Sequence, residues 1–340
     1  MSTGPGTGPG GVPAAIALTP ILSGRYRAGD LERIREAAPG ARLVTVSREG
    51  LTDDDLSDVE AMLRGPLPAT IFDRLLARCP NLRWVHSATA GVERVLTPQA
   101  AERGLVITNA RGVFSEPIAE YVLMMILAVV RRLPQLLELQ RERTWQPLEA
   151  AEMREVTVGI VGFGSIGRDV ARLAASFGAT VVATRRDVAG SAGGGDPTLP
   201  GVRILPADRL PDLLAISDFV VLALPLTPST EDLFDAAMFA RMKPGSWLIN
   251  VARGRLVDER ALVRALRDGP MGGAVLDALR DEPLPAESSL YDVPNLILTP
   301  HTSWSSGRVL DRSIELFCEN LRSFAAGEPL QNIVDAAKGY

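Results

Sequence analysis

A glycine-rich turn between an apolar run and a helix-like stretch places the strongest constraint on the fold of this chain. The motif Gly162-Phe163-Gly164-Ser165-Ile166-Gly167 follows the apolar run 156–161 and precedes the helical pattern 168–177. In such a unit the first glycine permits a tight turn, the second lets the backbone approach a pyrophosphate, and the third lets the helix pack on the strand. The helix N-terminus would hold the phosphates. The context disfavours a plain glycine-rich turn and predicts a dinucleotide site.

The strand after the glycine motif ends at the position where dinucleotide sites bind the ribose. NAD sites place an acidic residue about 20 residues beyond the glycines, where it holds the ribose 2′-hydroxyl. Here the segment reads Thr184-Arg185-Arg186-Asp187. Two guanidiniums and a hydroxyl would hold a 2′-phosphate, so the segment favours NADP over NAD. In the alternative interpretation, Arg185 and Arg186 are solvated and Asp187 binds the ribose of NAD.

Length and composition narrow the class of protein. A chain of 340 residues exceeds one typical domain, so two are expected. A net charge of −5 without a basic tract argues against a nucleic-acid partner. Cys79 and Cys318 lack metal-ligand spacing, which predicts core residues, no metal site and a reducing, cytoplasmic compartment. Residues 1–13 are predicted to be a disordered tail rather than a signal peptide, and the apolar run 118–130 is too short to span a membrane.

Short apolar runs alternate with helical patterns on both sides of the glycine motif, which is typical of parallel sheets covered by helices. The long helix 116–132 would mark the junction of two α/β units, and the last helix, 305–326, could return to the first unit. The expected domains are a discontinuous substrate-binding domain, 14–112 plus 305–340, and a dinucleotide-binding Rossmann domain, 113–304. A mobile loop is expected at 190–201, beside the adenosine. The expected strands are 14–18, 42–46, 59–63, 82–86, 105–108, 156–161, 179–184, 219–224, 247–251, 273–276 and 296–298; the other expected helices are 30–38, 69–79, 97–103 and 168–177.

Three side chains after the glycines have the chemistry for work on a carbonyl. A nicotinamide enzyme must anchor its substrate, polarise the C=O bond and deliver a proton near neutral pH. Arg253, Glu282 and His301 each follow an expected strand, at the sheet edge where α/β proteins bind ligands. Each signal is weak alone, because a loop arginine is usually solvated, a glutamate can belong to an acidic turn, and a lone histidine is more often structural.

Together with the glycine motif, these residues resemble the D-isomer-specific 2-hydroxyacid dehydrogenase family. The resemblance runs from Asn81 to the C-terminus. Its other segments are Ser87-Ala88-Thr89-Ala90-Gly91-Val92, Thr108-Asn109-Ala110-Arg111-Gly112, Glu116-Pro117-Ile118-Ala119-Glu120-Tyr121, Leu224-Pro225-Leu226-Thr227-Pro228 and Asp277.

The resemblance implies roles in binding and catalysis. Arg253 would clamp the substrate carboxylate and the 2-keto oxygen with its planar fork of donors. His301 would give a proton to the carbonyl oxygen as hydride arrives, and Glu282 would orient the imidazole and raise its pKa. The residues expected to contact substrate are Ala90, Gly91 and Val92, through their backbone N–H groups, with Arg253 and Trp304.

The resemblance also implies a set of cofactor contacts. Asp277 would bond the nicotinamide carboxamide, although a capping or turn role is the plain alternative. The other residues expected to contact the cofactor are Gly162, Gly164, Ser165, Ile166, Gly167, Thr184, Arg185, Arg186, Leu224, Pro225, Thr230 and Val251.

Two residues leave alternatives open. Trp304 stands where many family members carry small residues, and it is equally an apolar wall over the substrate or the nicotinamide, or a core residue at a helix start. His86 could approach the substrate mouth, but a satisfied structural histidine is favoured. The Arg185-Arg186 pair is similar to the pattern of the NADPH-linked reductases of the family.

The architecture that the resemblance implies is two Rossmann-like or flavodoxin-like doubly wound parallel-sheet domains with a cleft between them. Members are commonly homodimers, with the helix after Glu116 near the interface, although a core role for that helix is equally favoured. The leading hypothesis is an NADPH-dependent reductase of small 2-keto acids, glyoxylate- or hydroxypyruvate-like. The alternatives are an NAD-linked D-2-hydroxy acid dehydrogenase and a dinucleotide-sensing binding protein of the same fold.

Overall fold

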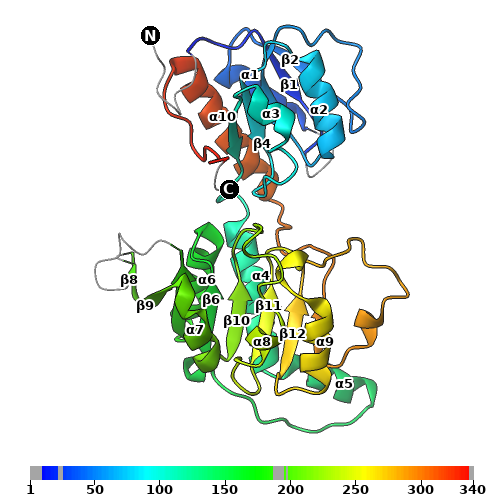
Figure 1. Cartoon of the computed structure of the whole chain (residues 1–340), viewed down its shortest axis with the longest axis vertical. Helices are drawn as coiled ribbons and strands as arrows, with labels where there is room; N and C mark the ends of the chain where they lie inside the picture. Colours follow the sequence, from blue (N-terminus) through cyan, green and yellow to red (C-terminus); the bar gives the residue numbers. More distant parts are fainter. Residues whose placement is uncertain (1–9, 22–25, 187–194, 197, 337–340) are drawn as a thin grey trace. The chain divides into compact units, whose positions relative to one another are not determined.

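The computed structural model describes residues 10–21, 26–186, 195–196 and 198–336, and the chain forms two compact α/β units (Figure 1). Unit 1 consists of residues 1–114 and 306–340, so two distant parts of the chain build it. Unit 2 consists of residues 115–305 and contains the glycine-rich turn.

Unit 1 is a five-stranded parallel sheet in the order β2-β1-β3-β4-β5, the flavodoxin-like arrangement. Successive residues of β1 face opposite sides: Ile16 packs with side chains of α1 and α10, and Ala17 with side chains of α2 and α3. Helices therefore cover both faces, as a doubly wound sheet requires. The elements are β1 (Ala15–Leu18), α1 (Ala28–Ala37), β2 (Arg42–Thr45), β3 (Val59–Arg64), α2 (Ala69–Arg78), β4 (Trp84–Ser87), α3 (Pro98–Glu102), β5 (Val106–Asn109) and α10 (Val309–Ala326).

Unit 2 is an eight-stranded sheet in the order β13-β12-β11-β10-β6-β7-β9-β8, parallel except for the short edge strand β8. The chain order reverses between β6 and β10, which is the topological switch point where open α/β sheets bind ligands. The strands are β6 (Thr157–Val161), β7 (Thr180–Arg185), β8 (Gly195–Asp196), β9 (Leu199–Pro206), β10 (Phe219–Leu222), β11 (Trp247–Asn250), β12 (Gly273–Leu276) and β13 (Leu296–Leu298).

Helices also cover both faces of this second sheet. Side chains of α7, α8 and α9 share one core with alternate strand residues such as Val220 and Leu222. On the other face α6 packs close to Ile160, and α4 lies against α6. The helices are α4 (Ser115–Val130), α5 (Leu133–Arg141), α6 (Ser165–Ser176), α7 (Leu210–Ile216), α8 (Ala236–Phe239) and α9 (Glu259–Arg267), with short 3₁₀ turns η1 (Met153–Glu155), η2 (Ala207–Arg209), η3 (Gly254–Leu256) and η4 (Ser289–Asp292).

Local sequence explains where several helices begin and end. The Thr97 hydroxyl accepts the Ala100 N–H at the start of α3, with Pro98 in the first turn. Asp258 caps α9 by accepting two backbone N–H groups. Gly178, at φ +87°, follows α6 in the left-handed conformation expected of a helix-ending glycine.

Two expectations about the chain after the glycine turn are wrong. The end of the predicted loop 190–201 contains β8 and the start of β9, which pair antiparallel; residues 190–194 and 197 lie outside the described residues. The last helix begins at Val309 rather than at residue 305. The helices α5, α7, α8 and α9 were not among the expected helices, although α9 shows helical periodicity, with Leu262 and Leu266 buried on one face.

None of the helices in the described part of the chain is both long enough and apolar enough to cross a lipid bilayer.

Candidate active site

The glycine-rich turn joins β6 to α6, and each of its three glycines has a different structural role. Gly162 has φ +98°, and a Cβ there would stand 2.6 Å from the carbonyl oxygen of Ala223. A Cβ at Gly167 would stand 2.2 Å from the Gly162 carbonyl oxygen, so only glycine lets the helix pack so closely. Gly164, the N-cap of α6, has open space where its Cβ would be. That space, before the first N–H groups of α6, fits a dinucleotide pyrophosphate.

The end of β7 places two arginines beside this turn. The Gly162 N–H donates to the carbonyl oxygen of Thr184 at 3.2 Å, which ties the turn to the last residues of β7. Arg185 and Arg186 follow directly and are exposed, whereas the Thr184 side chain is buried. Asp187, the alternative ribose ligand, lies outside the described residues.

His301 and Glu282 form a hydrogen-bonded pair at the carboxyl edge of the same sheet. The Nδ1 atom of His301 lies 2.9 and 3.1 Å from the two carboxylate oxygens of Glu282. Glu282 also accepts the Leu279 N–H at 2.9 Å, which holds its carboxylate in place. With Nδ1 bonded to a carboxylate, Nε2 is the ring atom left to exchange a proton with a ligand.

The pair shifts both pKa values in the direction that keeps it charged. The hydrogen bond to Glu282 raises the pKa of His301 above its ordinary value, and partial burial opposes this only in part. Burial alone would raise the pKa of Glu282, but the hydrogen bonds from His301 and Leu279 outweigh burial and lower it. The charge of Arg253 lowers both pKa values, which places its guanidinium within electrostatic reach of both groups.

Arg253 lies on a short loop, and two hydrogen bonds of the Asn250 side chain hold the shape of this loop. Asn250, at the end of β11, donates to the Arg253 carbonyl oxygen at 2.9 Å and accepts the Ala252 N–H at 3.0 Å. A Cβ at Gly254 would stand 1.9 Å from the Leu279 carbonyl carbon, so the loop lies directly on the segment that leads to Glu282. Close backbone packing therefore brings the arginine loop and the glutamate loop together.

Asp277 follows β12, and its carboxylate holds the turn that carries His301. Asp277 is 1% exposed, and its carboxylate accepts the Thr302 N–H at 2.8 Å, the Ser303 N–H at 2.9 Å and the Thr299 hydroxyl at 2.6 Å. These bonds satisfy the burial of a carboxylate. Asp277 therefore holds this turn, and its contact with the nicotinamide carboxamide stays a prediction.

Unit 1 contains the loop that was predicted to bind a carboxylate. Two side-chain hydrogen bonds hold the shape of this loop. The Thr89 hydroxyl donates to the Gly91 carbonyl oxygen at 2.8 Å, and the Asn109 amide donates to the Ala90 carbonyl oxygen at 2.8 Å. Within the described residues, the N–H groups of Ala90, Gly91 and Val92 donate no hydrogen bond. Fixed carbonyls and uncommitted N–H groups fit an anion-binding loop.

The other residues that were predicted to contact the cofactor lie in the loops after β10 and β11, at the same edge of the sheet. Leu224 and Pro225 follow β10, and Val251 follows β11 with its side chain buried. The Thr230 hydroxyl donates to the Pro225 carbonyl oxygen at 2.9 Å and accepts the Thr227 N–H at 2.8 Å. Thr230 therefore closes the turn after β10 within the chain itself.

Two residues with open alternatives are placed by the structure. Trp304 is half-buried and lies before Arg308, the N-cap of α10, so the interpretation that puts it at a helix start is wrong. His86 is fully buried, with Nδ1 2.8 Å from the Thr108 hydroxyl, and burial lowers its pKa to about 3. It is a structural histidine, but it is not fully satisfied, because Nε2 has no hydrogen-bond partner.

No cluster of three or more histidine, cysteine, aspartate or glutamate side chains suited to a metal ion occurs among the described residues. Both cysteines are free thiols in the core of unit 1, and burial raises the pKa of each to about 11.

Fold and site together define a class of protein. A Rossmann-type sheet carries the glycine turn at its switch point, and the paired His301 and Glu282 stand with Arg253 at the same carboxyl edge. This combination is that of a nicotinamide-dependent oxidoreductase acting on a hydroxyl or carbonyl group.

Comparison with known proteins gives the family. The NAD binding domain of the D-isomer specific 2-hydroxyacid dehydrogenases matches residues 123–303. A glyoxylate reductase of Korarchaeum cryptofilum is 31% identical over 315 residues, which cover 90% of each protein. The chain belongs to the D-isomer specific 2-hydroxyacid dehydrogenase family.

Two solved structures resemble the whole chain. A D-isomer specific 2-hydroxyacid dehydrogenase from Xanthobacter autotrophicus, in complex with NADPH and MES, has a TM-score of 0.83 at 30% identity and covers 98% of this chain and 100% of its own. An NADPH-dependent glyoxylate/hydroxypyruvate reductase from Sinorhizobium meliloti, in complex with NADP and sulfate, has a TM-score of 0.81 at 28% identity and covers 96% and 100%.

Sequence reasoning missed two residues that the structure connects to the site. Tyr121 was noted only as part of a helix and Thr299 was given no role, yet Tyr121 Oη lies 2.6 Å from Thr299 Oγ1. A separation of 178 residues leaves no local signal for such a contact.

Proposed function

We propose that the protein is an NADPH-dependent reductase that converts small 2-keto acids, of the glyoxylate or hydroxypyruvate kind, to D-2-hydroxy acids. The observation that carries the proposal is the His301–Glu282 pair within reach of the Arg253 charge, at the edge that carries the dinucleotide turn. The names of the glyoxylate reductase relative and of the two NADPH- or NADP-bound structures support the substrate class.

The chain's own residues perform distinct parts of this reaction. Bound NADPH supplies the hydride. Arg253 binds the carboxylate and polarises the keto oxygen with its fork of N–H donors. His301 donates a proton from Nε2 to that oxygen as negative charge develops on it, and Glu282 stabilises the imidazolium through Nδ1. In unit 1, the uncommitted N–H groups of residues 90–92 are suited to bind a carboxylate.

A substrate panel tests the proposal. The purified protein is assayed with a series of 2-keto acids and either NADPH or NADH, and oxidation of the reduced nicotinamide is followed by its absorbance. Reduction of glyoxylate or hydroxypyruvate, with higher kcat/KM for NADPH, is the expected result. Turnover only of D-2-hydroxy acids with NAD would instead assign an oxidative enzyme, and no turnover with any substrate would remove the proposal.

Cofactor choice is predicted to depend on the arginine pair. Changing both Arg185 and Arg186 to Ala should weaken NADPH binding by about 1.5–3 kcal/mol for each charged hydrogen bond lost and leave NADH binding nearly unchanged. Binding of both cofactors is measured by titrating protein fluorescence. The matched control is the double change of Arg264 and Arg267, exposed on α9, to Ala. An equal loss of both cofactors in the Arg185/Arg186 variant would return the assignment to NAD.

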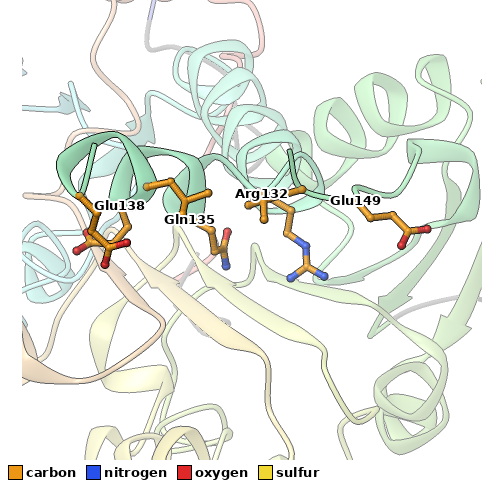
Figure 2. A pocket seen from close by; sticks show the side chains of 7 residues that line it. Arg132, Gln135, Glu138 and Glu149 are labelled. Atoms are coloured by element: carbon orange, nitrogen blue, oxygen red, sulfur yellow. The ribbon is translucent and has the colours of Figure 1, made fainter. Parts of the chain in front are cut away.

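We also propose that the enzyme is a homodimer formed through α4, α5 and the segment 142–149 of unit 2. No residue of α5 is buried, although Leu133, Leu136 and Leu137 lie on it, and Met124 of α4 and Trp145 are also exposed. Beside α5 is a pocket of about 390 Å³, and Figure 2 shows Gln135 and Glu138 projecting from the helix along it. The pocket is lined by Arg132, Gln135, Glu138, Leu139, Glu142, Leu148 and Glu149.

A second copy of the chain is the occupant that suits this face. The three exposed leucines of α5 and the fully exposed Trp145 would leave a large apolar area in water. Charged residues surround the apolar ones, as at the rim of a protein interface.

Placing charges on this face should therefore separate the subunits. The double change of Leu136 and Leu137 to Glu should convert a dimer to a monomer, because burying two unpaired carboxylates in the interface is strongly unfavourable. Light scattering coupled to size-exclusion chromatography measures the molar mass. The control is Ile216→Glu, which changes an exposed apolar residue of α7 and should leave the mass at that of a dimer. A monomeric wild-type protein, or a variant that stays dimeric, would contradict the proposed interface.

A further inference from the structure

A chain of three side chains links helix α4 to the turn that carries His301. Tyr121 Oη lies 2.6 Å from Thr299 Oγ1, and Thr299 Oγ1 lies 2.6 Å from Asp277 Oδ1. All three residues belong to unit 2. Tyr121 and Asp277 are buried, so these hydrogen bonds form in an environment where water cannot readily replace them.

The chemistry of the three groups determines the direction of the hydrogen bonds. An ionised aspartate only accepts, so Thr299 must donate its single hydroxyl proton to Asp277. The bond between Thr299 and Tyr121 therefore has the phenol as donor. Burial raises the pKa of Tyr121 to about 12, so the phenol keeps its proton at neutral pH. The donors run in one direction, from Tyr121 through Thr299 to the carboxylate.

These hydrogen bonds, from Tyr121 through Thr299 to Asp277, form a relay that ends at the turn carrying His301. The backbone of this turn is held by contacts with residues outside it. His301 has φ +49°, in the left-handed region that residues with a Cβ adopt at an energetic cost and keep only where their surroundings determine it. Its flanks are held through one carboxylate: Asp277 accepts the N–H groups of Thr302 and Ser303 after it and the hydroxyl of Thr299 before it. The His301 N–H also donates to the Thr299 carbonyl oxygen at 2.9 Å.

We propose that Tyr121 is a positioning residue for His301, acting through Thr299 and Asp277. The phenol holds the Thr299 hydroxyl toward Asp277, which in turn fixes the backbone on both sides of His301. The proton-donating task of His301 rests on the proposed reductase function, but the positioning itself does not depend on it.

The pKa of His301 can be measured to test this positioning, because the geometry of the turn sets the distance between His301 and Glu282. Three charged groups act on the imidazole: Glu282 through the hydrogen bond and its charge, Asp277 through its charge, and Arg253 with the opposite sign. The hydrogen bond to Glu282 contributes most to the raised pKa of His301. A turn that relaxes weakens that bond, so the pKa of His301 falls toward its ordinary value.

The chain is well suited to this measurement because it contains two histidines, His86 and His301. Burial keeps His86 neutral down to a pH of about 3, so His301 is the one imidazole expected to titrate near neutral pH. Ring signals of the ligand-free protein, followed by NMR as the pH is varied, report its pKa directly. Tyr121→Phe should lower that pKa, and an unchanged pKa in a folded variant would overturn the proposal.

Companion variants separate positioning from a general loss of packing. Thr299→Val removes the relay at its centre and should lower the pKa of His301, whereas Thr299→Ser keeps the hydroxyl and should preserve it. In the Thr299→Val background, Tyr121→Phe should have no further effect, because the two residues act in one pathway. Independent, additive effects would overturn the proposal. Tyr26→Phe is the matched control: it removes a phenol that donates to the Thr19 carbonyl oxygen in unit 1 and should leave the pKa of His301 unchanged.

Activity gives a second readout. Tyr121→Phe should reduce kcat roughly 10-fold, less than the roughly 10²-fold cost of moving a catalytic group by 1 Å, while KM for NADPH stays near the wild-type value. The high-pH limb of the reduction profile should move to lower pH with the NMR pKa. If the wild-type protein reduces no 2-keto acid but the NMR shift occurs, the proposed function fails and the positioning stands.

Discussion

His301→Gln should lower kcat for 2-keto acid reduction by about 10²–10⁴ while NADPH still binds, because the change removes the proposed proton donor and keeps a side chain of similar size. Steady-state kinetics measure kcat, and fluorescence titration measures cofactor binding. Loss of binding together with activity would indicate a damaged fold instead. Turnover equal to that of the wild-type protein would exclude His301 as the proton donor.

The same group determines the expected pH dependence. Reduction needs the imidazolium, and the hydrogen bond to Glu282 raises the pKa of His301, so activity should persist above the ordinary histidine pKa and fall as pH rises through the raised value. Glu282→Gln keeps the size of the side chain but removes its charge, so the high-pH limb should move to lower pH.

The pair also contributes to stability within a defined pH window. A raised histidine pKa stabilises the folded state below the ordinary histidine value, and the contribution is lost as pH rises through the folded pKa of His301. The lowered pKa of Glu282 stabilises above the ordinary glutamate value, and that contribution is lost as pH falls through its folded pKa. Because the side chains are 39% and 38% exposed, the effect should be modest.

Arg253→Ala should lower kcat/KM by about 10²–10⁴, which corresponds to two lost charge-assisted hydrogen bonds of roughly 1.5–3 kcal/mol each. KM should rise and kcat should fall together, because the arginine is proposed to bind both the carboxylate and the oxygen that gains charge. Arg253→Lys keeps the charge but loses the planar fork, so it should restore only part of the activity.

The neighbouring Arg255 supplies a control for this second prediction. Its guanidinium is exposed and bonds to Glu231, so Arg255→Ala removes an arginine from η3, the 3₁₀ turn that follows Arg253, without removing a proposed substrate ligand. We expect near wild-type kinetics for this variant. Normal kinetics for Arg253→Ala would mean that the arginine does not contact substrate.

Much of the dinucleotide half was predictable from local patterns. The glycine turn, the helix after it and the glycine that ends that helix are neighbours in sequence, and steric rules tie each of them to one backbone conformation. The parallel strands were predictable because apolar runs of four to six residues separated by helical patterns have few other solutions. The edge strand β8 was not, since two residues give no periodicity.

The candidate site was only partly predictable. Arg253, Glu282 and His301 each follow a strand, so their place at one edge of the sheet follows from parallel topology. His301 hydrogen-bonds both oxygens of Glu282, and Asp277 holds the histidine turn. Both contacts depend on side-chain directions that cannot be predicted from the sequence. The assignment of Asp277 to a cofactor contact rested on resemblance alone and stays a prediction, whereas its hydrogen bonds to the histidine turn are seen only in the structure.

The sequence by itself determined the fold class and the glycine turn, because each depends on local sterics or on short periodic patterns. Only the tertiary structure decided that Tyr121 and Thr299 meet, that His301 adopts a left-handed backbone conformation, and that Gly254 lies against Leu279. Those contacts join segments far apart in the chain, and their energies depend on packing between elements that no local pattern records.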